Sequence, residues 1–392
     1  MGISALALVM AAVFLYGTLC HRDLLDVVLG HSAPLVSGTL AGHAVVAVKG
    51  KTYPMLVPQP GGSVAGLLVL DASAGDLARL TFYEAGYRLA AVPVPVRLAT
   101  DAAQSVTAQV FVNDDPMAQP GGPWSLAAWQ AARGAMAVLA ACEYMAAFGT
   151  ANAATMAGRY PMMLVRAASY LRGQSDPAPT SLRHACQPGD VVVEAHRQPY
   201  AYFFAVEEYD LRHRRFDGSL SNRLNRATFV SGDAAVVLPY DPVTDRVMIV
   251  EQFRPGPLSR GDRQPWQLEP IAGRIDPGET PEQAARREAV EEAGISLGKL
   301  LPVANFYPSP GAKTEYLYSF VGIADLSDTR PRVAGLAEEG EDIRAHVLSF
   351  DALMALVQSG EVATAPLIMT AYWLEHRRAA LRADALKSVS VK

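Results

Sequence analysis

The sequence has little cysteine and no excess of positive charge. Its three cysteines, Cys20, Cys142 and Cys186, lie far apart and form no Cys-x-x-Cys pair. Neither a disulfide framework nor a cysteine-rich metal site is therefore expected, and free thiols suit a reducing, cytoplasmic location. The formal net charge is −5, from 34 Lys and Arg against 39 Asp and Glu, which argues against nucleic acid as the main partner.

Long hydrophobic runs are also scarce. The most apolar run, residues 3–16, is too short for a membrane-spanning helix. It has no basic residues ahead of it, and no clear small-residue cleavage site follows. We therefore expect no signal peptide and no membrane partner. The chain also contains no internal repeat and no low-complexity run.

The length of the chain suggests more than one domain. Half of its 392 residues are apolar, so two or three domains could each bury a core. A polar, proline-bearing stretch over residues 173–181 is the best linker candidate. We expect a first domain over residues 1–120, a helical segment and linker over 121–187, and a second domain over 188–386.

A helix is predicted over residues 281–293. Thr280 and Gln283 are spaced as a capping-box pair, and Pro281 takes the first helical position. Gly294 is placed to end the helix.

Three glutamates, Glu288, Glu291 and Glu292, share one face of this helix because they stand at i, i+3 and i+4. Like charges at that spacing repel, whereas a hard divalent cation would turn the repulsion into attraction. The pattern predicts a metal-dependent phosphate enzyme. The alternative is an ordinary solvated helix with glutamates on its outer face.

The wider pattern favours the first interpretation. Gly273 is followed after five residues by Glu279, and after seven more by the run Arg287-Glu-Ala-Val-Glu-Glu-Ala-Gly-Ile295. This spacing resembles the Nudix box of hydrolases that cleave a nucleoside diphosphate linked to another moiety. Ala289 is a soft departure, since the family allows a large aliphatic residue there. By the resemblance, Arg287 and Glu279 hold the loop against the helix.

The same resemblance implies a metal site. Glu288 and Glu292 would be direct ligands of Mg²⁺, or of Mn²⁺ as the alternative ion. Glu291 would bind directly or through water, and the backbone carbonyl of Ala272 would be a further ligand. The implied fold of the second domain is an α/β/α Nudix sandwich.

Flanking segments resemble the ADP-ribose pyrophosphatase branch of the family. They are Trp266-Gln-Leu-Glu-Pro-Ile-Ala-Gly273, Tyr307-Pro-Ser-Pro-Gly311 and Thr314-Glu315, and the resemblance covers about residues 190–385. It implies hydrolysis of ADP-ribose to AMP and ribose 5-phosphate. Another nucleoside-diphosphate sugar is the alternative substrate.

The branch resemblance also implies residue roles. Glu339, in an acidic loop over residues 335–344, would be the catalytic base, with Glu341 on metal or water. Arg254 would contact the diphosphate, Arg226 the terminal part of the substrate, and Glu315 would lie near it. The alternative for the loop is a solvated acidic segment.

Members of this branch are usually homodimers that exchange amino-terminal strands, and residues 191–218 have the required alternating pattern. Tyr200, Tyr202 and Phe203 in this region could stack on adenine, but we expect them in the core.

A second constellation lies near the amino terminus. Val13 to Leu19 reads as a strand ending in a glycine turn, and Leu77 to Arg88 contains Phe-Tyr-Glu84-Ala-Gly-Tyr. Both segments resemble the gamma-glutamylcyclotransferase-like (AIG2-like) family. Thr18 stands where that family commonly has Ser, and the Glu84 segment is a modest departure.

This resemblance implies a small β-barrel with helices. The turn formed by Tyr16, Gly17, Thr18 and Leu19 would bind the carboxylate and amine of a γ-glutamyl compound. Glu84 would be the acid and base in a reaction where the substrate's α-amine attacks its own side-chain carbonyl and releases 5-oxoproline. Its aromatic neighbours should raise its pKa by desolvation. The alternative is a barrel without activity that binds a ligand or dimerises.

The expected fold class is thus α+β and α/β, with the cyclotransferase-like barrel followed by the Nudix sandwich.

Overall fold

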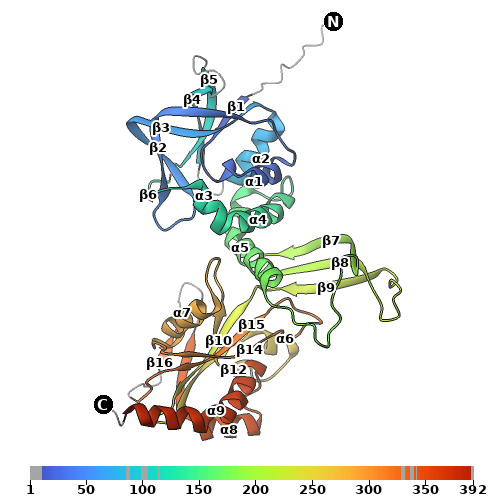
Figure 1. Ribbon diagram of the computed structural model, residues 1–392, viewed down its shortest axis with the longest axis vertical. Coiled ribbons are helices and arrows are strands. Elements are labelled where there is room, and N and C mark those ends of the chain that lie inside the picture. The colour runs from blue at the N-terminus through green and yellow to red at the C-terminus, as the bar shows by residue number, and fades with distance from the viewer. Residues whose placement is uncertain are drawn as a thin grey trace. The chain divides into compact units, whose positions relative to one another are not determined.

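The computed structural model describes residues 11–84, 89–98, 105–113, 115–327, 332–335, 340 and 342–389. The chain divides into two compact units, Met1–Ser175 and Asp176–Lys392 (Figure 1). Each unit is described by itself. Within the described ranges, no helix combines the length and the hydrophobicity that crossing a membrane requires.

Unit 1 is built on a six-stranded sheet in the order β3-β1-β5-β4-β2-β6. Its strands are β1 (Ala11–Leu15), β2 (Val36–Val48), β3 (Pro54–Ala72), β4 (Leu89–Leu98), β5 (Ser105–Asn113) and β6 (Pro120–Pro123). β2 also pairs with β3 along most of its length. Each of the strands β1 to β5 is therefore paired with at least two others of the five. The mixed β-sheet and helix class predicted for this part is confirmed.

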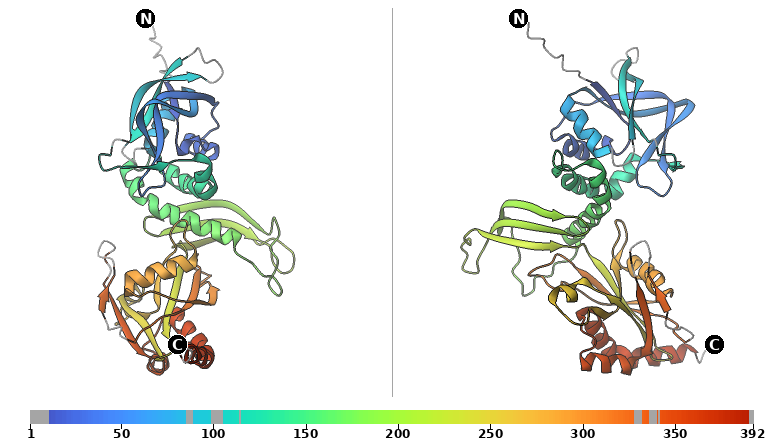
Figure 2. Two further views of the ribbon diagram at one scale, coloured as in Figure 1. Left: turned by 60° about the vertical axis from the view of Figure 1, so that its left-hand side comes forward. Right: turned by 180° about the vertical axis from the view of Figure 1, so that it is seen from behind.

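Helices pack beside this sheet in unit 1, as the two views of Figure 2 show. They are η1 (Thr18–Cys20), α1 (Arg22–Leu29), α2 (Ala74–Glu84), α3 (Leu126–Trp129), η3 (Gln130–Gly134), α4 (Ala135–Ala146) and α5 (Ala153–Ser175). Leu25, Leu80, Tyr144 and Met163 meet in one buried cluster, which joins α1, α2, α4 and α5. α5 runs through the first residues of the expected linker and ends where the two units divide.

Unit 2 contains an eight-stranded sheet with the main order β14-β15-β10-β11-β17-β16, to which β12 and β13 add at β11 and β10. These strands are β10 (Ala234–Asp241), β11 (Arg246–Phe253), β12 (Trp266–Glu269), β13 (Ile271–Arg274), β14 (Leu300–Phe306), β15 (Leu317–Ile323), β16 (Arg332–Ala334) and β17 (Ile343–Ser349). The helices of this unit are α6 (Pro255–Arg260), α7 (Pro281–Ala293), α8 (Phe350–Ser359) and α9 (Ala365–Val389).

The two faces of this sheet are covered by different helices. Val237 and Val250 pack with the alanines of α7, whereas Leu238 and Ile249 pack with α8 and α9. Alternate residues of β10 and β11 therefore point to opposite cores, as strand geometry requires. Figure 2 shows α7 and the α8–α9 pair on opposite sides of the sheet, and the predicted α/β/α sandwich is confirmed.

A separate three-stranded antiparallel sheet precedes the sandwich within unit 2. It consists of β7 (Val191–Ala201), β8 (Ala205–His213) and β9 (Leu224–Val230). Tyr200, Tyr202 and Phe203 are 57%, 55% and 47% exposed, so the expectation that they belong to the core is wrong. Tyr200 lies near the end of β7, and Tyr202 and Phe203 lie in the turn between β7 and β8. Phe203 is covered on one side by the Arg274 guanidinium at 4.0 Å.

Candidate functional site

The junction between β13 and α7 forms the predicted loop and helix of the Nudix-like pattern. Thr280 Oγ1 accepts from the Gln283 backbone N–H at 3.3 Å, and Gln283 Oε1 accepts from the Thr280 N–H at 2.8 Å. Gly294 ends the helix at φ 56°, in the left-handed region that glycine adopts without strain. The helix predicted over residues 281–293 is confirmed.

Arg287 is the electrostatic centre of this junction. Its guanidinium donates to both oxygens of Glu279 at 2.9 Å, to Glu288 Oε1 at 2.6 Å and to Glu291 Oε2 at 2.9 Å. A further bond to the Arg274 carbonyl, at 2.9 Å, ties the loop to the helix. The Arg287 hydrogen bond holds the pKa of Glu279 below its usual range. One guanidinium thus offsets part of the repulsion among the glutamates.

Two glutamates reach the main chain of β13. A Cβ on Gly273 would lie 1.8 Å from Glu288 Oε1, so only glycine leaves room for that carboxylate. Glu292 is 2% exposed, and its Oε2 accepts from the Ala272 N–H at 3.3 Å. Glu288 and Glu292 therefore approach adjacent residues, while Glu291 turns to Arg287.

The atoms at this junction that could bind a metal ion are all oxygens, the ligand type that Mg²⁺ and Mn²⁺ prefer. Glu288, Glu292 and the Ala272 carbonyl fit such an ion by type and by their common location. Among the residues that the structure describes, no three His, Cys, Asp or Glu side chains already surround one point. Glu341, the further predicted ligand, lies outside the described residues, as does the predicted base Glu339.

The predicted diphosphate contact Arg254 is held by a carboxylate from the next strand. Arg254 Nε and Nη2 lie 2.8 Å and 2.7 Å from Glu269 Oε2, and Gln252 Nε2 reaches the same oxygen at 3.2 Å. The Arg254 side chain is 38% exposed. No role was predicted for Glu269, because its pairing with Arg254 depends on the register between β11 and β12.

The other two predicted substrate residues lie on neighbouring segments. Arg226 stands on β9, is exposed, and donates to the Asn225 carbonyl at 2.8 Å. Glu315 accepts from Lys313 Nζ at 3.3 Å. A bridge between Phe229 and Lys313 brings the end of β9 beside this segment. The roles of Arg226 and Glu315 stay predictions.

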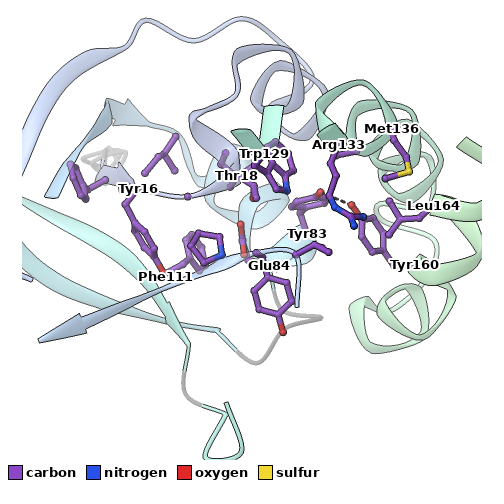
Figure 3. Close-up of a pocket in the computed structure, with 18 residues that line it drawn as sticks. Tyr16, Thr18, Tyr83, Glu84, Phe111, Trp129, Arg133, Met136, Tyr160 and Leu164 are labelled. Atoms are coloured by element: carbon purple, nitrogen blue, oxygen red, sulfur yellow. Dashed lines mark hydrogen bonds between the residues drawn. The ribbon is translucent and has the colours of Figure 1, made fainter. Parts of the chain in front are cut away.

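Unit 1 contains a separate pocket. Tyr16, Gly17, Thr18 and Leu19 follow β1, Glu84 ends α2, and all five line the same pocket (Figure 3). Its empty space is about 860 Å³, part of it continuous with solvent. The structure thus brings together two motifs that are far apart in the sequence.

The electrostatics of this pocket centre on Glu84. Burial raises the pKa of Glu84 to about 7. The pKa of Tyr16 is raised by burial and then by the charge of Glu84, and the same two causes raise that of Tyr144 to about 12. A carboxyl that titrates near neutral pH can both accept and donate a proton there.

Three further residues reach this pocket from α3, η3 and α5, namely Trp129, Arg133 and Tyr160. Sequence analysis missed them because helical spacing there indicated only packing. Tyr160 and Tyr83 share a hydrogen bond of 3.2 Å between their hydroxyls, which anchors α5 to α2 (Figure 3).

Comparison with known proteins agrees with both motifs. Residues 230–369 match the NUDIX domain, and residues 13–130 match "Gamma-glutamyl cyclotransferase, AIG2-like". The chain is 40% identical over 193 residues to an ADP-ribose pyrophosphatase of Escherichia coli K12, covering 49% of this chain and 91% of the relative. It is 33% identical over 205 residues to the ADP-ribose pyrophosphatase of Haemophilus influenzae (52% and 94%) and 32% identical over 167 residues to a GDP-mannose pyrophosphatase of Escherichia coli (43% and 84%). Both predicted resemblances are confirmed.

Proposed function

The chain belongs to the Nudix family, and we propose that its C-terminal unit hydrolyses ADP-ribose to AMP and ribose 5-phosphate with Mg²⁺ as cofactor. The observation that carries the proposal is the junction of β13 and α7. There Glu288 and Glu292 approach Gly273 and Ala272, and Arg287 fixes the loop. The name of the relative that is 40% identical supports the substrate.

Different residues of this chain would bind the cation, contact the diphosphate and accept the proton. Glu288, Glu292 and the Ala272 carbonyl would hold the cation. When bound, such an ion neutralises charge on the diphosphate and lowers the pKa of a coordinated water. Arg254 keeps Nε and Nη2 on Glu269, which leaves Nη1 for a phosphate oxygen. Glu339 is our candidate for the base that accepts the proton of the attacking water.

A different nucleoside-diphosphate sugar is the second candidate substrate. The relative that is 32% identical is named for GDP-mannose, which supports a broader class. Rates on ADP-ribose and GDP-mannose at matched concentrations separate the two candidates. Equal rates on both sugars would remove the preference for ADP-ribose.

The variant Glu292→Gln tests the assigned metal site. Gln keeps an oxygen that can accept from the Ala272 N–H, so the fold should persist while the negative charge is lost. We expect a loss of about 100-fold or more in Mg²⁺-dependent turnover, the scale of losing one preorganised charge contact. Glu282→Gln is the matched control, because Glu282 is exposed on the first turn of the same helix. Full activity in folded Glu292→Gln would contradict the assignment.

For unit 1 we propose γ-glutamyl cyclotransferase activity. The match over residues 13–130 and the joint location of Glu84 and the turn at residues 16–19 support it. The α-amine nitrogen of the substrate bonds to its own γ-carbonyl carbon, and the bond from that carbon to the leaving nitrogen breaks. Protons pass from the α-ammonium to the leaving amine through Glu84, so no water is consumed.

A non-catalytic binding or dimerisation module is the alternative for unit 1. Release of 5-oxoproline from γ-glutamyl amides by the intact protein separates the two. Loss of that release in Glu84→Gln supports the proposed role, whereas release that survives the substitution removes Glu84 from the mechanism.

We also propose a cytoplasmic homodimer through unit 2. Val191, Val193 and Tyr200 on β7 are each more than half exposed, and a second copy would cover these apolar side chains. Analytical ultracentrifugation of the native chain and of Val193→Asp tests this. We expect a dimer that the substitution converts to monomer, and a native monomer at micromolar concentration would contradict it.

A further inference from the structure

Arg133 lines the pocket of unit 1 and has no polar partner among the residues that the structure describes. It is half-buried within η3, and Figure 3 shows its side chain extending beside Tyr83 and Tyr160. Over the described part of the chain, no carboxylate, carbonyl or hydroxyl pairs with its guanidinium. By contrast, Arg166 on α5 is paired with Glu143, with Nε 3.0 Å from Oε2. A half-buried guanidinium among aromatic side chains gains most from an anionic ligand.

The local fold holds Arg133 at a fixed place. It lies in a π-helical turn, a feature often found at functional sites, between α3 and α4. Gln130 Nε2 is 3.1 Å from His21 Nδ1, and the Trp129 ring packs edge-on against His21 with centroids 6.1 Å apart. His21 is the C-cap of η1 (Thr18–Cys20), which forms part of the turn that is predicted to bind the γ-glutamyl group. The helix that carries Arg133 is thereby docked on that turn.

Arg133 and Glu84 serve different parts of a ligand. In the view of Figure 3, the Tyr83 side chain lies between the Glu84 carboxylate and the Arg133 guanidinium. Glu84 must reach the amide that breaks, and the turn at residues 16–19 takes the carboxylate and amine of the glutamyl end. The space beside Arg133 is left for the group on the leaving nitrogen.

The match to the cyclotransferase family ends at residue 130, so Arg133 belongs to a segment outside that match. Met136 and Leu164 also line this part of the pocket, and both are apolar (Figure 3). Arg133 is therefore a single positive charge among uncharged neighbours in this part of the pocket.

We propose that Arg133 binds a carboxylate on the leaving amine, so that unit 1 prefers γ-glutamyl amino acids or peptides over γ-glutamyl derivatives of neutral or cationic amines. The inference rests on the proposed cyclotransferase function. The reaction with such a substrate yields 5-oxoproline and the free amino acid or peptide. A cationic leaving amine would be repelled by the same guanidinium.

A matched pair of substrates tests the inference on the intact protein. γ-Glutamylglycine carries the carboxylate, and γ-glutamylglycinamide replaces it by a neutral group of nearly the same shape. We expect the native protein to favour the first by about 10-fold or more in kcat/KM, the scale of one charge-assisted hydrogen bond. In Arg133→Met this ratio should fall towards one. Arg22→Met, on the exposed face of α1, is the control and should keep the native ratio.

Binding of the same two compounds to Glu84→Gln, measured by calorimetry, separates the inference from the function on which it rests. Turnover without any Arg133-dependent preference overturns the inference and leaves the cyclotransferase proposal standing. No turnover, but binding with that preference, overturns the cyclotransferase and supports the carboxylate site. Equal losses on both compounds in Arg133→Met would place Arg133 on the glutamyl end and overturn the inference. Neither turnover nor binding overturns both.

Discussion

Replacing Glu84 by Gln should make unit 1 more stable at neutral and alkaline pH. Burial raises the pKa of Glu84 from 4.5 to about 7, which means that the folded state disfavours the charged carboxylate. The unfolded chain therefore loses the Glu84 proton at a lower pH than the folded chain does. The contribution of neutral Glu84 to the free energy of unfolding is fully present below pH 4.5 and is lost as the pH rises through about 7.

The magnitude follows from the size of the shift. At about 1.4 kcal/mol for each pKa unit, a rise from 4.5 to about 7 corresponds to a loss of about 3 kcal/mol above pH 7. This is an upper bound, because the side chain keeps some exposure to the pocket and nearby water screens its charge. Gln is neutral at every pH, so Glu84→Gln should lack this loss.

Native-state hydrogen exchange in the intact chain measures the effect where it occurs. Peptides from β5 and α2 report on unit 1, and comparison at one pH cancels the intrinsic exchange rates and the titration of other carboxylates. We expect similar protection of both proteins near pH 5 and up to about 100-fold slower exchange in Glu84→Gln near pH 8. Equal protection at pH 8 would show that the carboxylate is solvated and would refute the reasoning.

Three further predictions concern unit 2. Gly273→Ala places a Cβ 1.8 Å from Glu288 Oε1, so ADP-ribose hydrolysis should fall sharply. The free energy of unfolding, measured by thermal denaturation, should fall by about 1–3 kcal/mol. Native activity together with native stability would contradict the close approach. Arg287→Met removes the partner of Glu279, Glu288 and Glu291 and should lower the free energy of unfolding by about 1–3 kcal/mol, with a larger stabilisation by added Mg²⁺ than in the native protein. An Mg²⁺ effect no larger than in the native protein would argue that the glutamates do not bind the ion. Glu269→Gln weakens the hold on Arg254 and should raise KM for ADP-ribose by about 10-fold, whereas an unchanged KM and kcat would remove Arg254 from substrate binding.

Much of the Nudix junction could be predicted because its signals are local. The capping box at Thr280, the glycine stop at Gly294 and the spacing of Glu288 and Glu292 each depend on residues within one loop and one helix. The role of Gly273 also belongs to this stretch, since the helix that follows brings Glu288 against it.

Other features depend on contacts between distant segments. The bond from Arg254 to Glu269 needs the register of β11 with β12. The pocket wall formed by Trp129, Arg133 and Tyr160 needs three helical segments, α3, η3 and α5, to meet at one pocket. The exposure of Tyr200 was predicted wrongly for the same reason. An alternating strand pattern indicates which residues share a face, but not what covers that face.

The most direct test of the central claim is incubation of the intact protein with ADP-ribose, with and without Mg²⁺, and quantification of both the nucleotide and the sugar-phosphate product by chromatography. We predict equimolar AMP and ribose 5-phosphate only when Mg²⁺ is present, with the rate largely abolished in Glu292→Gln. A folded native protein that releases no AMP above the buffer rate in the presence of Mg²⁺ would contradict the account.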